Sequence, residues 1–534
     1  MTRTCVRDVA CASVGPLTVE LQKRWEVREP ALLWYGYIYY VISFLGVFTV
    51  TVSVLQLLYQ SSTNYVRVVK ELLPLVISFF LFLAALVLVV IYSTLELYST
   101  FAYSDFTSFS GRASSYTSKP FTYLDNSIST YLLTVEYVNL TLVSIYTFPF
   151  VYIFIFITML SLFFCLSYNV SEIAAFSFYV SVILTAGYVL FFTDSLILFF
   201  FSYETLLVPS FFILYNFAKT RRCVEAAYLM FFWTQFGALF LILAFLYIFF
   251  VCGASSFSAI SDFYFNVFEL NFIFLCLLFG FGVKLPIWPF YGWLPKAHVE
   301  ASTNFSIFLS GVLVKFAFFG FLKCLLAIQL EPTFYFVYPF LIVGIVDSVF
   351  KLFYQIDLKK LVAYSTVVEM HWLTLCVVSG QSSLILSGFC MLISHALLST
   401  NSFLLVDALA RRFKTRLVTE ISGINFICPK LFLISLANLL VFLGFPGSIM
   451  FISEILFFAF LFDLFPALYL LLVVLLYLVA PTFVFRTWMN VLFGASVNFN
   501  RELPTDLSSK ELLVYTSLLF IMFWLGANWQ AFLF

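Results

Sequence analysis

Residues 232–251 read FWTQFGALFLILAFLYIFFV, a run of 20 residues without a charged side chain. A helix needs about 20 apolar residues to cross the hydrocarbon core of a bilayer. Residues 76–92 form a second run without charge. Of the 534 residues in the chain, 63% are hydrophobic and 10% are charged, against about 25% charged in an average soluble domain. The sequence therefore predicts a membrane protein built from spanning helices.

Apolar windows of this kind recur along the chain and predict an all-α, polytopic membrane protein with about 14 transmembrane helices. In the first half the spans are expected near residues 32–59, 72–96, 138–166, 173–192, 194–217 and 224–251. In the second half they are expected near residues 269–293, 304–328, 333–354, 359–379, 384–409, 430–460, 465–491 and 511–531.

Basic residues gather in alternate loops and predict the orientation of the spans. The loops after the fifth, ninth and eleventh spans contain Lys219, Arg221, Arg222, Lys359, Lys360, Arg411, Arg412, Lys414 and Arg416. The loops after the fourth, sixth, tenth and twelfth spans contain neither lysine nor arginine. Because basic loops favour the matrix or cytoplasmic side, we expect the first set of loops there. Basic residues before the first span and after the second oppose this placement, but they are outnumbered.

Charge and cysteine patterns exclude several classes of function. The net charge is zero, and no basic block points to nucleic acid as a partner. The ten cysteines are scattered, without a C-x-x-C pair or a Cys/His cluster at metal-ligand spacing. The sequence also lacks a glycine-rich dinucleotide loop and a haem-ligand pattern. We therefore expect no metal and no redox cofactor bound by this chain.

Four ionisable residues lie deep within predicted spans: Glu204, Lys284, Lys315 and Glu454. Burying such a residue at the centre of a membrane helix costs roughly 3 kcal/mol on insertion scales, so each is a candidate functional residue. The alternative for each is a static buried ion pair that only fixes helix packing. The presence of four such residues together favours function.

Three histidines and a further glutamate complete the candidate set. His395 lies inside the eleventh span, and its ordinary pKa of about 6.5 suits a proton relay. The alternative is a packed, hydrogen-bonded histidine. Glu369 and His371 lie in the tenth span, where Glu369 is either a relay member or a residue facing a water-filled cavity. His298 is predicted to be a structural residue in the loop after the seventh span.

Proline and glycine predict two broken helices. Pro286 and Pro289 follow Lys284 and remove amide donors, so the seventh span should open beside the lysine. Residues 444–447 read GFPG and should break the twelfth span close to Glu454. Spans four to eight and spans nine to thirteen form two sets of five. In each set the break falls in the fourth span. Inverted repeats with broken helices are typical of transporters.

This symmetry predicts five parts of the chain. They are a polar segment at residues 1–31, peripheral spans at 32–172, a first antiporter-like repeat at 173–328, a second at 333–491, and a loop with the final span at 492–534.

Residues 284–301 read KLPIWPFYGWLPKAHVEA and resemble the signature of the chain 4 family of NADH:ubiquinone oxidoreductase, respiratory complex I. The final HVEA is the specific part. Further matches are SGVLVK at residues 310–315, DLKKLVAYSTV at 357–367, and GFPG at 444–447 followed by Glu454. The resemblance covers roughly residues 137–495, whereas the first 130 residues diverge.

The resemblance implies an antiporter-like subunit with a proton half-channel in each repeat. By that resemblance Glu204 and Lys284 are the glutamate and lysine of the first half-channel, Lys315 is a bridging lysine, and His395 is a link on a polar axis. Glu454 matches the terminal carrier. One departure is that the family commonly has histidine at the position of Glu369, whereas here the histidine is His371.

The resemblance also implies where the remaining chemistry lies. NADH, FMN, iron–sulfur clusters and ubiquinone would be bound by partner subunits, and the antiporter-like subunits 2 and 5 are the expected neighbours. The expected location is the mitochondrial inner membrane, with a bacterial plasma membrane as the alternative. A rival hypothesis is a free-standing cation/proton antiporter of related fold, and another is a purely structural span that braces the complex.

Overall fold

The structure is a computed structural model that describes residues 154–158, 160–161, 170–218, 220–261, 263–328, 337–464, 466–494 and 504–529. Within these ranges the chain is helical and forms no strand, apart from two isolated bridges, Ser195 with Ser256 and Asp357 with Leu417. Eight helices of the described part are long and apolar enough to cross a membrane. The all-α, multi-pass class is therefore confirmed, while the total of 14 spans stays a prediction.

The first group of helices covers four of the predicted spans and the first broken one. Its helices are α5 (Val170–Phe192), α6 (Leu196–Thr205), α7 (Leu207–Asn216), α8 (Arg221–Cys252), α9 (Phe257–Ser261), α10 (Val267–Lys284), α11 (Trp293–Glu300), α12 (Thr303–Phe308) and α13 (Val314–Ala327). A short 3₁₀ turn, η2 (Phe290–Gly292), precedes α11, and a π-helical turn, η3 (Leu309–Leu313), joins α12 to α13. The predicted spans at 32–59 and 72–96 lie outside the described residues, as does most of 138–166.

The second group follows from residue 337 onward. Its helices are α14 (Val337–Phe353), α15 (Leu358–Val378), α16 (Ser382–Phe413), α17 (Ile424–Ile427), α18 (Pro429–Phe442), α19 (Ile449–Leu464), α20 (Pro466–Leu472), α21 (Ala480–Phe493) and α22 (Ser509–Ala527). A second π-helical turn, η4 (Val473–Val479), lies between α20 and α21. No feature of its sequence accounts for this turn.

Both predicted breaks are present. The first lies between α10 and α11, around Pro286 and Pro289, and the second lies between α18 and α19, where Gly444 and Gly447 have φ of 68° and 92°. These left-handed conformations are accessible to glycine at little cost. A third irregularity at Leu206 separates α6 from α7 and was not predicted. Its cause is Pro209, which leaves the Thr205 carbonyl without its helical N–H donor.

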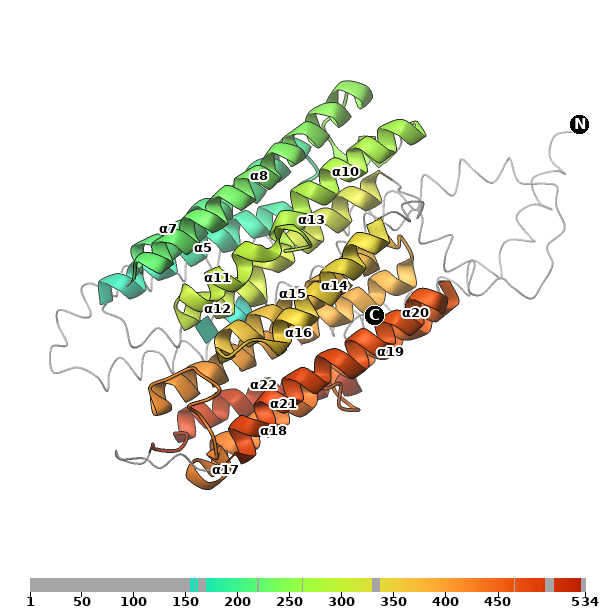
Figure 1. Cartoon of the computed structure of the whole chain (residues 1–534). Helices are drawn as coiled ribbons and strands as arrows, with labels where there is room; N and C mark the ends of the chain where they lie inside the picture. Colours follow the sequence, from blue (N-terminus) through green and yellow to red (C-terminus); the bar gives the residue numbers. More distant parts are fainter. Residues whose placement is uncertain are drawn as a thin grey trace, which may run out of the picture. The chain divides into compact units, whose positions relative to one another are not determined.

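Burial separates central helices from peripheral ones. In the most apolar 18-residue stretch of α16 all positions are buried, and in those of α15 and the α12–α13 segment 94% are buried. The corresponding share for α8 is 33%. Figure 1 shows α15 and α16 between the green helices of the first group and the red helices α19 and α22. Helices α15 and α16 therefore have no face left for lipid and form the core, whereas α8 has an apolar face directed outward.

The basic loops meet at one end of the helices. Lys359 Nζ at the start of α15 donates to the Ala301 carbonyl at 2.7 Å, and Arg416 Nη1 donates to the Val299 carbonyl at 3.0 Å. Thr220, at the start of α8, contacts Glu300 at 3.5 Å. A cavity of about 340 Å³ lies among these residues. The loops after the predicted fifth, ninth and eleventh spans thus share one end, as the basic residues predict.

Helices α8 and α10 approach closely at two glycines. A Cβ atom added at Gly237 would lie 2.8 Å from the Gly280 carbonyl oxygen and 3.2 Å from Val283 Cβ. Small residues permit such close contact of helix backbones in membranes, where dispersion forces and packing hold helices together. The pair therefore sets the distance between α8 and the helix that carries Lys284.

We predict that Gly237→Ala separates these helices and destabilises the protein by about 1–3 kcal/mol, the usual cost of overpacking. Gly292→Ala is the matched control, because a Cβ there would meet nothing within 4 Å and its φ is −59°. Thermal unfolding in detergent measures the difference. Equal melting temperatures for the two variants would show that the glycine contact does not determine helix packing.

A buried series of ionisable side chains

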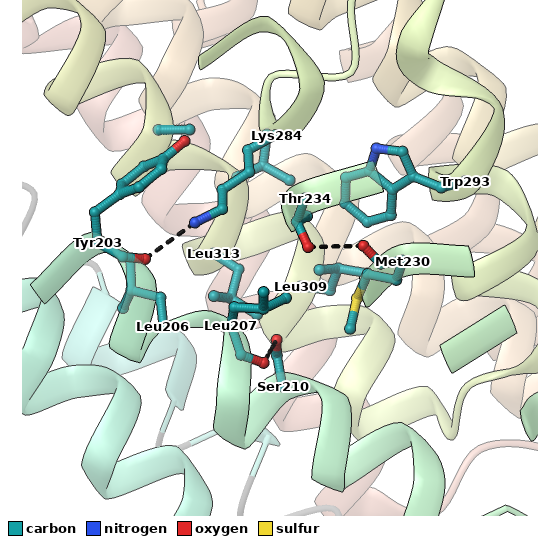
Figure 2. A pocket seen from close by; sticks show the side chains of 12 residues that line it. Tyr203, Leu206, Leu207, Ser210, Met230, Thr234, Lys284, Trp293, Leu309 and Leu313 are labelled. Atoms are coloured by element: carbon teal, nitrogen blue, oxygen red, sulfur yellow. Dashed lines mark hydrogen bonds between the residues drawn. The ribbon is translucent and has the colours of Figure 1, made fainter. Parts of the chain in front are cut away.

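Lys284 and Glu204 form an ion pair across the first group of helices. Lys284 is the last residue of α10, and its Nζ lies 3.6 Å from Glu204 Oε1 on α6. The ammonium also donates to the Tyr203 carbonyl at 3.0 Å, and Gln235 Nε2 donates to Glu204 Oε2 at 3.1 Å. Figure 2 shows Lys284 directed toward Tyr203. Glu204 and Lys284, which the resemblance assigns to one half-channel, are therefore in contact.

The helix break beside Lys284 has its own stabilising contacts. Ile287 N–H donates to the Gly282 carbonyl at 2.9 Å, and the indole N–H of Trp293 donates to the Val283 carbonyl at 2.8 Å. These bonds replace helical ones that the prolines remove, which is the condition for irregular backbone inside a membrane. Lys284 therefore ends a helix whose next turn is fixed by one main-chain and one side-chain hydrogen bond.

A small cavity adjoins the pair. It has a volume of about 30 Å³ and is lined by Lys284, Tyr203, Thr234, Ser210 and Trp293 together with apolar residues of η3 and α13. The hydroxyls of Thr234 and Ser210 donate to carbonyls of their own helices at 2.7 Å, which leaves their oxygens free to accept. The space suffices for about one water molecule with polar partners.

Lys315 lies fully buried on α13. Its ammonium donates to the carbonyl of Ser310, five residues earlier in the π-helical turn η3. A π turn shifts the hydrogen-bond register by one residue and is often found at functional sites. The turn gives the lysine a main-chain partner where the described residues offer it no ion pair. Sequence patterns did not predict this turn.

Glu369 and His395 are in contact across the core. Glu369 Oε2 on α15 bonds to His395 Nδ1 on α16, and both side chains are buried. His395 Nε2 has no partner among the described residues. The sequence treated the two residues as separate candidates, and the structure brings them together.

Glu454 lies on α19, directly after the second break. Its side chain is buried, and its Oε2 atom has no hydrogen-bond partner within the described ranges. A cavity of about 40 Å³ lies between Glu454 and Glu369, with Ser365 and Trp372 also in its wall. Glu369 thus contacts His395 on one side and shares a cavity with Glu454 on the other.

Of the two remaining histidines, His371 lies in the predicted tenth span, within α15, whereas His298 is placed differently from expectation. His298 was predicted in a loop, but it lies within α11, because the helix resumes at Trp293 and continues to Glu300 after the break. Its buried ring stacks on Phe403 with centroids 4.9 Å apart. His371 does not face Glu369: its Nε2 atom accepts a hydrogen bond from the main-chain N–H of Trp288 at 2.8 Å.

Sequence patterns did not single out the buried Lys323 or the partly exposed pair of Asp347 and Lys351. Lys323 on α13 donates to the carbonyl of Phe191 at 3.0 Å and to that of Thr193. Asp347 on α14 pairs with Lys351 at 2.8 Å, and Tyr291 of η2 bonds to both. Lys323 and Asp347 interrupt apolar predicted spans, so the criterion that selected Lys315 would also have selected them.

A sequence profile described as "NADH:quinone oxidoreductase/Mrp antiporter, TM" matches residues 193–480. Over 334 residues the chain is 37% identical to NADH-ubiquinone oxidoreductase chain 4 of Paramecium tetraurelia, covering 62% of this chain and 70% of that relative. The chain belongs to the NADH-ubiquinone oxidoreductase chain 4 family. The chain 4 protein of Marchantia polymorpha is 32% identical over 342 residues, covering 63% and 69% of the two chains.

Solved structures agree on the fold of this chain 4 family member. A chain of respiratory complex I from Thermus thermophilus superposes with a TM-score of 0.62 at 19% identity, covering 72% of this chain and 82% of that one. A chain of the Mrp complex from Dietzia sp. gives 0.63 at 14% identity, with the same coverages. At these identities the likeness concerns the fold alone.

We predict that Gly444→Ala impairs function more than Gly447→Ala. Both residues have positive φ, so both substitutions strain the backbone by roughly 1 kcal/mol. Only at Gly444 would the new Cβ collide with Glu454, at 2.2 Å from Oε2, whereas at Gly447 it would meet nothing within 4 Å. NADH-driven proton uptake by sealed vesicles, normalised to assembled complex, measures the effect. Equal losses would mean that the position of Glu454 is unimportant.

Proposed function

We propose that the chain is a proton-translocating membrane subunit of an NADH-ubiquinone oxidoreductase. The observation that carries this proposal is the pair Lys284–Glu204 at a helix break, 3.6 Å apart and beside a cavity of water size. Membership in the chain 4 family supports the same function. The description of the profile names both an oxidoreductase and an antiporter. The 37% sequence identity to an oxidoreductase chain 4 favours the oxidoreductase.

The mechanism at the first pair is electrostatic. A buried ammonium is stabilised by a carboxylate in contact with it, and this stabilisation falls as the carboxylate moves away. A displacement of Glu204 relative to Lys284 therefore changes the affinity of the lysine for its proton. Pro209 supports such motion, because it removes the helical hydrogen bond to the Thr205 carbonyl, next to Glu204.

From Lys284 the proposed route continues through Lys315 to His395, Glu369 and Glu454. Glu369 interacts electrostatically with both Lys315 and Glu454. Its contact with His395 and the cavity it shares with Glu454 support a central place in the route. Glu369 thereby takes the role that the family commonly gives to a histidine, and His371 lies off this route.

The proposed organisation has two inverted repeats, residues 173–328 and 333–491, with one broken helix in each. The breaks α10–α11 and α18–α19 support it, since each has an ionisable residue beside it. The segments 1–31, 32–172 and 492–534 would be peripheral to the two repeats.

Partners supply the redox chemistry in this proposal. NADH, FMN, iron–sulfur clusters and ubiquinone would be bound by other subunits, and the antiporter-like subunits 2 and 5 would be direct neighbours in the mitochondrial inner membrane. The proposed enzymatic role is that of a translocase subunit without redox chemistry of its own. A free-standing antiporter is the rival, and native mass determination separates the two, since only the subunit belongs to a large assembly.

Lys284→Ala should abolish NADH-driven proton uptake by sealed vesicles, because general acid–base groups contribute roughly 100-fold or more to proton transfer. Lys296→Ala is the matched control, since it removes an exposed lysine from the second half of the same broken helix. A native gel checks assembly of the complex in both variants. Full proton stoichiometry in an assembled Lys284→Ala complex would refute the proposed function.

A further inference from the structure

The segment between α10 and α11 is tied to the second group of helices at two points. The main-chain N–H of Trp288 donates to His371 Nε2 on α15 at 2.8 Å. Three residues later the Tyr291 hydroxyl bonds to Asp347 on α14, which pairs with Lys351. The break beside Lys284 is therefore held by residues that lie outside the first group of helices.

The hydrogen bonds of His371 fix its tautomer. Its Nδ1 atom lies 2.8 Å from the carbonyl oxygen of Val367, which can only accept, so Nδ1 must carry the hydrogen. Nε2 then presents a lone pair to the Trp288 N–H. The imidazole is fully buried, and a Cβ added at Gly344 would lie 2.1 Å from Nε2. The ring thus occupies a space that exists because residue 344 is glycine.

This arrangement holds only while His371 is neutral. A proton that adds to the Nε2 lone pair gives an imidazolium with two N–H donors and no acceptor. The Trp288 N–H then faces another donor, and its hydrogen bond is lost. The titratable or charged groups around the ring are Tyr291 of η2 and Asp347 with Lys351 of α14. On its own helix, Glu369 precedes it by two residues.

We propose that His371 is a positioning residue that fixes the helix break while neutral and releases it when protonated. A proton that reaches His371 from the neighbouring Asp347, Lys351 and Tyr291 side chains would then alter the support of Lys284 in the other repeat. His371 would thereby make the state of the first half-channel depend on the second. This inference rests on the proposed function, in which Lys284 transfers protons.

Two substitutions test the role of the imidazole. In His371→Gln the side-chain amide oxygen can still accept from Trp288, but it takes no proton at physiological pH. In His371→Phe no acceptor remains. Cys376→Ala is the control for altered packing, because Cys376 is also fully buried on α15. Each variant is assayed as the whole membrane complex for the ratio of protons taken up to NADH oxidised, across a range of pH, and for its melting temperature.

We expect His371→Gln to keep the wild-type melting temperature but to lower the ratio of protons taken up to NADH oxidised, because the helix break is no longer released. In this variant the proton ratio should also lose its change at the acid end of the pH range, where wild-type His371 takes up a proton and releases the break. His371→Phe should melt at a lower temperature, and Cys376→Ala should retain the wild-type proton ratio. If His371→Gln pumps with the wild-type ratio and pH profile, His371 is only a structural acceptor and the inference is wrong.

A parallel Lys284→Met variant distinguishes a failure of the role given to His371 from a failure of the proposed function. If it loses pumping while His371→Gln pumps normally, only the role of His371 is refuted. If Lys284→Met itself pumps with the wild-type ratio, the proposed function is refuted and the positioning role goes with it.

Discussion

The absence of water from the bilayer core is the constraint on which the rest of this structure depends. A main-chain polar group or a charge at that depth is costly unless it finds a partner inside the protein. The break after α10 illustrates how this is met, since the indole of Trp293 and the imidazole of His371 take the places of helical hydrogen bonds. Lys284 can end a helix in the membrane only because these side chains complete its surroundings.

The same constraint explains why much of the fold could be predicted. A span must be apolar over its full length, and this pattern is visible without any tertiary information, as for residues 232–251 within α8. Pro286, Pro289 and the glycines of residues 444–447 act on their own backbone, so the breaks near Lys284 and Glu454 also follow from local sequence. Irregularities with a weaker sequence signal were not predicted. The one at Leu206 is an example, because Pro209, which causes it, stands three residues further along the chain.

Pairing within the site could not be predicted in the same way. That Glu369 meets His395, whereas His371 meets Trp288, depends on how α15 is rotated between its neighbours. Glu369 and His371 are two residues apart, so they point in different directions from a helix, and an apolar helix that is buried all round shows no sequence pattern that reveals its rotation. The candidate residues were therefore identifiable from sequence, but their partners were not.

The packing of the core also limits how a proton could travel in the proposed route. The cavities beside Lys284 and between Glu369 and Glu454 have volumes of about 30 and 40 Å³, enough for single water molecules rather than a continuous water chain. Lys315 follows Val314, which lines the first cavity, and its ammonium is bound to the Ser310 carbonyl of its own helix. A flexible four-carbon stem lets a lysine move its charge without moving the backbone. Transfer between the two halves would then depend on reorientation of the Lys315 side chain, which makes the route a gated sequence of short steps rather than an open channel.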